Sequence, residues 1–140
     1  MTNRKLGAII RNQKPLILSH TATVQSACQE MSKRNVGCVL VVDDKKKLVG
    51  IFTGRDAVRT VGKSGNVSTI ELNKVMTQRP LTVASHQRAC DALQMMCDGG
   101  FRHLPVVEGE NILGVVSRND FKGMEVDQID QCEHLAECIW

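Results

Sequence analysis

The sequence is short of aromatic residues, which make up 3% of its 140 positions and include no tyrosine. A chain of this length can bury about 68–70% of the surface that it exposes when unfolded. Its core must therefore be aliphatic, built from Val, Leu, Ile, Met and Ala. A core of that size needs neither disulfides nor metal ions to hold it together.

Long apolar runs and paired cysteines are also absent. No run approaches the ~18 residues of a membrane-spanning helix, and we expect no signal peptide. The six cysteines form no Cys-x-x-Cys pair. Four of them lie within apolar patterns, as small buried hydrophobic residues do: Cys28, Cys38, Cys90 and Cys97. The sequence therefore predicts a cytoplasmic protein with reduced thiols.

The net charge and the absence of certain motifs exclude further functional classes. The net charge is +3, which is far from the dense basic surface of a nucleic-acid binder. No Gly-rich phosphate loop or nucleophile elbow is present, so we expect no catalysis. Cys132, His134 and Cys138 near the C-terminus lack a fourth ligand at the spacing of a zinc site. An amphipathic helix with Ile129, Leu135 and Ile139 is the better interpretation of that tail.

What the sequence does contain is a repeat. Pro15 and Met31 match Pro80 and Met96, in each case 65 positions later. After a one-residue deletion, GIFTGRD at 50–56 matches GVVSRND at 114–120, with an offset of 64. Self-similarity at a fixed period indicates two copies of one structural unit.

Each copy has the same predicted elements. Apolar residues at i, i+3, i+4 and i+7 give a helix one buried face, with Thr23 and Ser85 as N-caps and Gly99 as a stop. Two β-branched runs with a polar turn between them then predict a hairpin. A short strand precedes the helix, and a second helix follows the hairpin. These flanking elements are expected at Leu16–Leu18 and Leu81–Val83 for the strands, and near Arg55–Val61 and Arg118–Met124 for the helices.

The predicted class is therefore α/β (α+β), with two β-α-β-β-α units packed sheet to sheet in a pseudo-two-fold pair. Lead-in helices are expected at Arg4–Gln13 and Thr69–Met76. The predicted boundaries are 5–62 for the first unit, 63–75 for the linker and lead-in helix, 76–125 for the second unit, and 126–140 for a tail helix.

The repeated seven residues allow two interpretations. Thr53 with Asp56, and Ser117 with Asp120, have the spacing of a capping box, which stabilises a strand-to-helix junction without any ligand. The same geometry suits a nucleotide, since a helix N-terminus attracts phosphate and an acid one turn later can hold a ribose diol. On this second interpretation, a base approaching the backbone explains why Gly50 and Gly114 lie inside strands.

The repeat, the order of elements, both motifs and FRHLPVVE at 101–108 resemble a tandem pair of CBS domains, the family named after cystathionine β-synthase. The resemblance covers Lys5 to Glu125 and implies a freestanding regulatory module that binds AMP, ADP, ATP, NAD or S-adenosylmethionine. It implies that Asp56 and Asp120 hold ribose hydroxyls, and that Thr53 and Ser117 lie near ribose or phosphate. The other implied contacts border adenine and phosphates: Leu16, Ile17, Gly37 and Cys38 in the first unit, and Leu81, Thr82, Arg102 and His103 in the second.

The two units differ where phosphate is expected. Gly37 and Cys38 stand where the second unit has Arg102 and His103. Arg55 and Arg118 fit either a phosphate contact or a solvated helix face, and Gly54 stands where many family members have an acid. The charges favour a phosphorylated adenosine, AMP first, in the second unit. His20 and His86 are expected to be ordinary surface residues.

Two functions follow from these patterns. The first is a signal-transduction module that senses an adenine nucleotide and performs no reaction. The alternative is a protein-interaction module that forms homodimers and holds a target protein, with vestigial ligand sites. Apolar helix positions beyond the core stripe would form the dimer contact in either case: Met95, Cys97, Val58 and Val61.

Overall fold

The structure is a computed structural model, and it describes residues 3–121. The chain divides into two compact units. The first unit is Pro15–Pro80, and the second combines the described residues before Pro15 with those from Leu81 onward. Within the described part of the chain, no helix is long and apolar enough to cross a bilayer.

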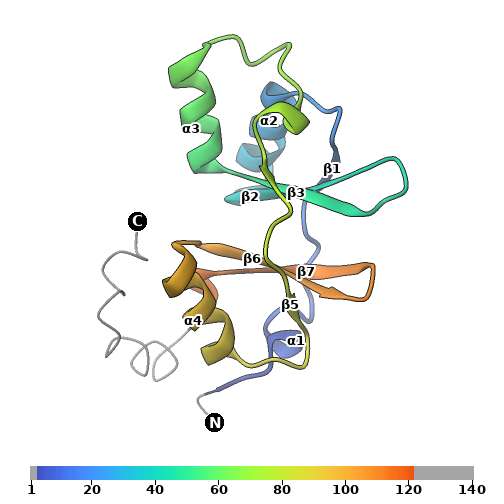
Figure 1. Cartoon of the computed structure of the whole chain (residues 1–140), viewed down its shortest axis with the longest axis vertical. Helices are drawn as coiled ribbons and strands as arrows, with labels where there is room; N and C mark the ends of the chain where they lie inside the picture. The colour runs from blue at the N-terminus through green and yellow to red at the C-terminus, as the bar shows by residue number, and fades with distance from the viewer. Residues whose placement is uncertain (1–2, 122–140) are drawn as a thin grey trace. The chain divides into compact units, whose positions relative to one another are not determined.

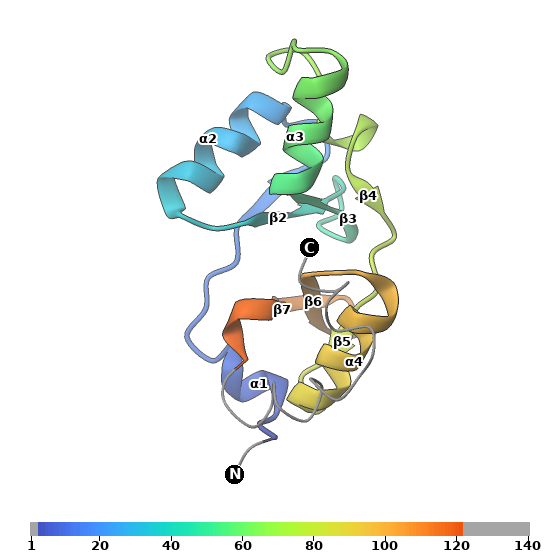
Figure 2. The same ribbon diagram turned by 90° about the vertical axis from the view of Figure 1, so that its left-hand side faces the viewer.

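The first unit is a four-stranded sheet with helices on one side (Figure 1, Figure 2). The strands lie in the order β1-β2-β3-β4, where β1 and β2 are parallel and the other pairs are antiparallel. Helices α2 and α3 cover the same face in both views. The elements are β1 (Ile17–Ser19), α2 (Val24–Arg34), β2 (Cys38–Val42), β3 (Leu48–Thr53), α3 (Gly54–Lys63), the 3-10 helix η1 (Leu72–Lys74) and β4 (Thr77–Gln78).

The second unit is a three-stranded sheet in the order β5-β6-β7, with β5 parallel to β6 and β6 antiparallel to β7. Helices α1 and α4 lie on the same side of this sheet (Figure 1, Figure 2). The elements are α1 (Leu6–Ile9), β5 (Val83–Ala84), α4 (Ala89–Gly99), β6 (His103–Glu108), β7 (Asn111–Ser117) and the 3-10 helix η2 (Arg118–Asp120).

The predicted α/β class and the repeated order of elements are confirmed. The helix predicted near Arg118–Met124 is shorter in the structure, because η2 ends at Asp120 and Phe121 has extended backbone, with φ −91° and ψ 146°. Residues 122–124 and the predicted tail helix at 126–140 lie outside the described residues. Each lead-in segment contains less helix than predicted: four residues in α1 and three in η1.

Several predicted boundaries need correction. Thr23 is the N-cap of α2, where its hydroxyl accepts a hydrogen bond from the N–H of Ser26 at 3.1 Å. Ser85 is not a cap, because α4 begins at Ala89 with Arg88 before it. Gly99 is the last helical residue, and the stop is Gly100, whose φ of 72° suits a glycine. The first strand of the second unit is Val83–Ala84 instead of Leu81–Val83.

The apolar stripes of helices α2 and α4 are buried, as their spacing predicts. Val24, Ala27 and Met31 are buried in the first core, while Cys28 is half-buried. The second stripe is fully inside its core: Ala89, Ala92, Leu93 and Met96. Among the described cysteines, Cys38 and Cys97 are buried and Cys28 and Cys90 are half-buried, and none of the four is paired in a disulfide.

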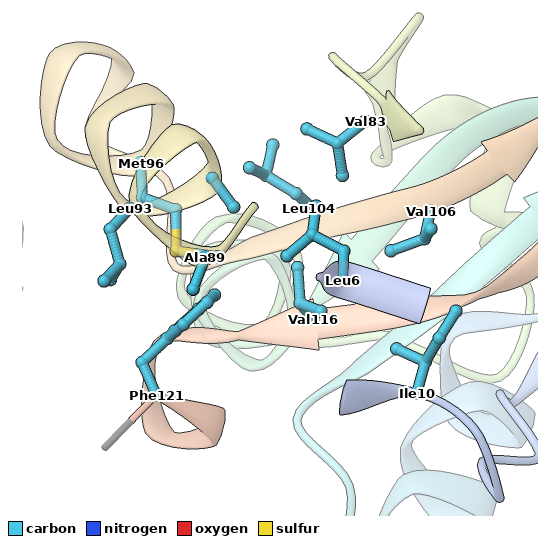
Figure 3. Packing of buried hydrophobic residues seen from close by; sticks show 11 residues of the cluster. Leu6, Ile10, Val83, Ala89, Leu93, Met96, Leu104, Val106, Val116 and Phe121 are labelled. Carbon is cyan, nitrogen blue, oxygen red and sulfur yellow. The ribbon is translucent and has the colours of Figure 1, made fainter. Parts of the chain in front are cut away.

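The segment before each repeat packs against the other repeat. Leu6 is fully buried in the second unit, beside Leu104 and Val116 (Figure 3), and its N–H donates to the Gln87 carbonyl at 2.8 Å. Leu72 is fully buried in the first unit. Residues 5–14, predicted with the first unit, therefore belong to the second, and β4 belongs to the first.

These segments also explain the two strand glycines, and they correct the expectation that a base approaches them. A Cβ on Gly50 would collide with the side chain of Met76. A Cβ on Gly114 would lie 2.7 Å from Gln13 Oε1 and 3.1 Å from Ile10 Cβ. Gln13 is fixed there, since its carboxamide bonds both the N–H and the C=O of Val115, at 2.6 and 2.7 Å. Protein atoms, not a ligand, occupy the space beside both glycines.

This packing predicts that Gly114→Ala destabilises the protein by about 1–3 kcal/mol, as overpacking of a tight contact does. Gly54→Ala is the matched control, because no atom lies within 4 Å of a Cβ there and the residue opens a helix. The free energy of unfolding in urea measures both. Equal stability of the two variants would contradict the assigned contact.

Candidate nucleotide-binding site

In the first unit, the predicted site residues gather at one edge of the sheet. Cys38, the first residue of β2, pairs with Thr53, the last residue of β3. The N–H of Gly54 donates to the Gly37 carbonyl at 3.1 Å. The start of β1 lies at the same edge, because the Leu40 N–H donates to the Leu16 carbonyl at 2.9 Å.

The second unit repeats this arrangement with different side chains. His103, the first residue of β6, pairs with Ser117, the last residue of β7. The N–H of Arg118 donates to the Arg102 carbonyl at 2.9 Å. Leu81 and Thr82 immediately precede β5, whose Val83 pairs with Val106 of β6. The predicted residues of each unit therefore share one edge of that unit's own sheet.

The exposure of these residues is uneven. Leu16 and Cys38 are buried, and Ile17 and Leu81 are 40% and 53% exposed. Gly37, Arg55 and Thr82 are exposed, while Arg102, His103 and Arg118 are half-buried. A ligand at these edges would therefore meet exposed apolar side chains from β1 or from the residues before β5, and in the second unit the half-buried side chains of Arg102, His103 and Arg118 as well.

The capping-box interpretation of the repeated motif is correct for the first unit. The N–H of Asp56 donates to Thr53 Oγ1 at 3.3 Å, and the N–H of Thr53 donates to Asp56 Oδ2 at 3.0 Å. The shorter aspartate thus completes the reciprocal bond. In the second unit the N–H of Ser117 donates to Asp120 Oδ2 at 2.7 Å.

The capping bonds use only one oxygen of each carboxylate. All the hydrogen bonds of Asp56 and Asp120 side chains to described residues use Oδ2. Each Oδ1 therefore retains its capacity to accept hydrogen bonds. The two differ in access, because Asp56 is only 8% exposed whereas Asp120 is half-buried. A structural and a ligand-binding role are compatible in one residue.

Positive charge is concentrated in the second unit. Burial lowers the pKa of His103, the neighbouring Arg102 lowers it further, and Asp120 opposes them by raising it. These influences mean that the imidazole lies near both charged groups. Nε of Arg118 is buried and has no hydrogen-bond partner among the described residues. A buried N–H donor without a partner costs free energy that an anionic ligand would recover.

The first unit offers no such group in its matching strand positions. Gly37 and Cys38 carry no charge, and Arg55 is exposed on α3. Of the other histidines, His86 is exposed as expected, but His20 is half-buried. Its Nε2 lies 3.5 Å from Asp44 Oδ1, so it has a structural contact that its sequence position did not indicate.

A separate hollow of about 400 Å³ lies at the opposite end of β6. Its lining includes Val107, Glu108 and Gly109, whereas the candidate site begins at His103. Five residues of extended chain separate these ends by roughly 16 Å. The hollow shares only Thr82 with the predicted set, so it is distinct from the candidate site. Residues 3–121 contain no group of three His, Cys, Asp or Glu residues placed to hold a metal ion.

Comparison with known proteins supports the fold and its repeat. A sequence model of the CBS domain matches residues 7–63 and 71–124. The CBS domain-containing protein CBSCBSPB1 of Arabidopsis thaliana is 37% identical over 129 residues, which are 91% of this chain and 23% of that protein. The chain thus spans about a quarter of the length of this curated relative.

Two solved structures share the fold. A CBS domain protein of Pyrobaculum aerophilum, complexed with AMP, superposes with a TM-score of 0.81 at 22% identity, covering 92% of this chain and 100% of that one. The CBS domain pair of protein MJ0100, in complex with 5′-methylthioadenosine and S-adenosyl-L-methionine, gives 0.75 at 19% identity, covering 91% and 96%. With two matched repeats on two similar sheets, the chain belongs to the CBS domain family.

Proposed function

We propose that this chain is a regulatory module that binds an adenosine phosphate, AMP first, at the second unit and performs no reaction on it. The observation that carries the proposal is the buried, unpartnered Nε of Arg118 beside Asp120 and His103. Among the described residues, Arg118 Nε has no hydrogen-bond partner and Asp120 Oδ1 accepts no hydrogen bond. These two groups on one turn match the two polar ends of a nucleoside monophosphate.

Asp120 is the ligand for the ribose end. Its Oδ2 accepts the Ser117 N–H, which fixes the carboxylate on the turn. Its Oδ1 then accepts hydrogen bonds from ribose hydroxyls, as acids do in dinucleotide folds. A carboxylate held by one oxygen is already oriented, so little side-chain entropy is lost when the sugar binds.

Positively charged side chains of the second unit bind the phosphate end. A guanidinium binds phosphate through two parallel N–H···O bonds, and such charge-assisted bonds are roughly twice as strong as neutral ones. Arg118 provides that group from the turn itself, and Arg102 adds positive potential from the residue before the adjacent strand. AMP is the smallest ligand that offers base, ribose and phosphate together, and ATP and NAD carry the same three groups.

Related proteins support an adenosyl ligand in general. One relative by fold is a complex with AMP, and another is a complex with 5′-methylthioadenosine and S-adenosyl-L-methionine. The last two ligands share adenosine with AMP but carry no phosphate. The positive groups of the second unit are therefore the reason to choose a phosphorylated ligand for this chain.

One observation favours the second candidate function, a homodimeric interaction module. On α3, Val58 is 73% exposed and Val61 is 55% exposed, and a spacing of three places them on one helix face. Two other members of the predicted patch do not contribute. Cys97 is buried and Met95 packs against the core of the second unit. The patch proposed for the dimer therefore consists of the two valines of the first unit.

The nucleotide proposal predicts that Asp120→Ala weakens AMP binding more than Asp56→Ala does. Each lost hydrogen bond to the carboxylate contributes about 1.5–3 kcal/mol, which is tenfold or more in Kd. Calorimetric titration with AMP measures both variants. A larger loss in Asp56→Ala, or equal losses, would refute the assignment to the second unit.

Asp91→Ala is the matched control for this titration. Asp91 Oδ2 accepts the Arg88 N–H at 2.9 Å, so it has the same capping role at α4 without belonging to the site. Its removal lowers helix stability by about 1 kcal/mol and leaves AMP affinity unchanged. A similar loss of AMP affinity in Asp91→Ala would mean that the titration reports folding and not ligand contact.

If the phosphate lies beside His103, AMP raises the pKa of this residue. In the free protein this pKa lies below its ordinary value because burial and Arg102 disfavour the imidazolium. A nearby phosphate favours the imidazolium, so by linkage AMP binds more tightly as the pH falls through the pKa of His103. NMR titration of the imidazole signals, with and without AMP, measures the shift. His20 and His86 serve as internal controls, and a His103 pKa that AMP leaves unchanged contradicts the phosphate placement.

The dimer proposal predicts that Val58→Lys with Val61→Lys converts a dimer into a monomer, because four lysines would then meet across an isologous contact. Light scattering gives the mass at high micromolar concentration. Gln25→Lys with Gln29→Lys adds the same charge at exposed positions of α2 and should leave the mass unchanged. A wild-type monomer, with and without nucleotide, would rule the dimer out.

A further inference from the structure

A residue outside the predicted set holds the candidate ribose-binding turn. Nη2 of Arg4 donates to the main-chain carbonyl of Asp120 at 2.9 Å, across 116 positions of sequence. That carbonyl closes the three-residue helix η2, which carries both Arg118 and Asp120. Carbonyls at the end of a short helix have no partner within the helix. The Arg4 guanidinium provides one for Asp120.

The first unit satisfies the same carbonyl from within its own helix. Asp56 O accepts the hydroxyl of Thr60 at 2.8 Å, one turn further along α3. The residue that matches Thr60 in the second repeat, 64 positions later, is Met124, which has no hydroxyl. Two copies of one turn are therefore fixed by different means, one local and one remote.

The residue that corresponds to Arg4 in the first unit is Ile70. The carbonyl of Arg4 accepts the Ala89 N–H at 2.8 Å, and the carbonyl of Ile70 accepts the Val24 N–H, also at 2.8 Å. Because Ala89 and Val24 open the equivalent helices α4 and α2, this places Arg4 and Ile70 at equivalent positions. Isoleucine has no side-chain donor, so the first unit has no such bond.

The segment that carries Arg4 is attached to the second unit at several points. The Leu6 and Gly7 N–H groups donate to the carbonyls of Gln87 and Ser85 at 2.8 and 2.9 Å. Leu6 and Ile10 share one core cluster with Phe121, the residue after Asp120 (Figure 3). The segment and the turn are thus joined both by the Arg4 bond and by common packing.

We propose that Arg4 is a positioning residue for the ribose-binding turn of the second unit, and that it couples occupancy of that turn to docking of segment Asn3–Gln13. The inference rests on the proposed function, since it takes Asp120 as the ribose ligand. A nucleotide that binds only the ordered turn favours the docked segment, and the docked segment favours the nucleotide to the same extent, because coupling between two sites is reciprocal.

The first test compares AMP affinity in the full chain and its variants. Arg4→Met keeps a long apolar stem but removes the donor, and we expect it to weaken AMP binding by about tenfold, within the range of coupling between two sites. Lys5→Met is the matched control. Lys5 is exposed and adjacent, and its loss removes the same unit of charge, so AMP affinity should stay within about twofold of wild type if only the Arg4 bond matters.

The second test measures hydrogen exchange in the segment itself. Hydrogen exchange of the Leu6 and Gly7 amides should slow when AMP saturates the wild-type chain, by about the same factor as the loss in affinity on Arg4→Met. In Arg4→Met, AMP should leave these two exchange rates unchanged. Circular dichroism and the urea midpoint establish that the variant is folded before either measurement.

The outcomes separate the two proposals. If AMP binds wild type, is lost in Asp120→Ala and binds Arg4→Met with unchanged affinity, the Arg4 inference is overturned and the proposed function stands. Equal weakening by Arg4→Met and Lys5→Met also overturns it, since net charge would then be the cause. A wild-type chain that does not bind AMP overturns both.

Discussion

The packing of each lead-in segment against the opposite repeat is the constraint on which the rest of the structure depends. Leu6 and Leu72 are both fully buried, and burial of such a side chain contributes about 1.5–3 kcal/mol. Their N–H groups make equivalent bonds of 2.8 Å, to Gln87 and to Ala22. Neither repeat completes its core with the segment that precedes it in the chain. The second unit therefore forms only when distant parts of the chain come together, whereas the first is the continuous stretch Pro15–Pro80.

Elements set by local pattern could be predicted from the sequence. The apolar stripes, both hairpins and the capping box of Thr53 and Asp56 depend on residues within one or two turns of each other. The prediction of an N-cap at Ser85 was wrong for a physical reason. Gln87 bonds Ala84 twice, through its N–H at 3.1 Å and through its side chain at 2.7 Å, and this turn delays the start of the helix.

The site was predictable in part, for the same reason. The repeated motif located both turns, and strand register alone brings the other predicted residues to the same sheet edges. The roles of Gly50, Gly114 and Arg4 were not predictable, because each is set by a lead-in segment. Gln13 reaches Val115 across 102 positions and Arg4 reaches Asp120 across 116. No periodicity or motif in a single sequence records such a pairing.

The two turns show how one motif can serve different purposes within a chain. In the first unit, a ten-residue helix and the Thr60 hydroxyl hold the turn, and the carboxylate of Asp56 is buried. That turn is fixed by residues of its own helix, so a bound ligand would change its conformation little. In the second unit the turn is a three-residue helix whose last carbonyl accepts a hydrogen bond from Arg4, and Asp120 is more accessible. Only an element with two accessible arrangements can transmit a binding event. The two repeats build the same turn twice. Only the turn of the second unit is bonded to a lead-in segment through a side chain, because Arg4 stands where the first unit has Ile70.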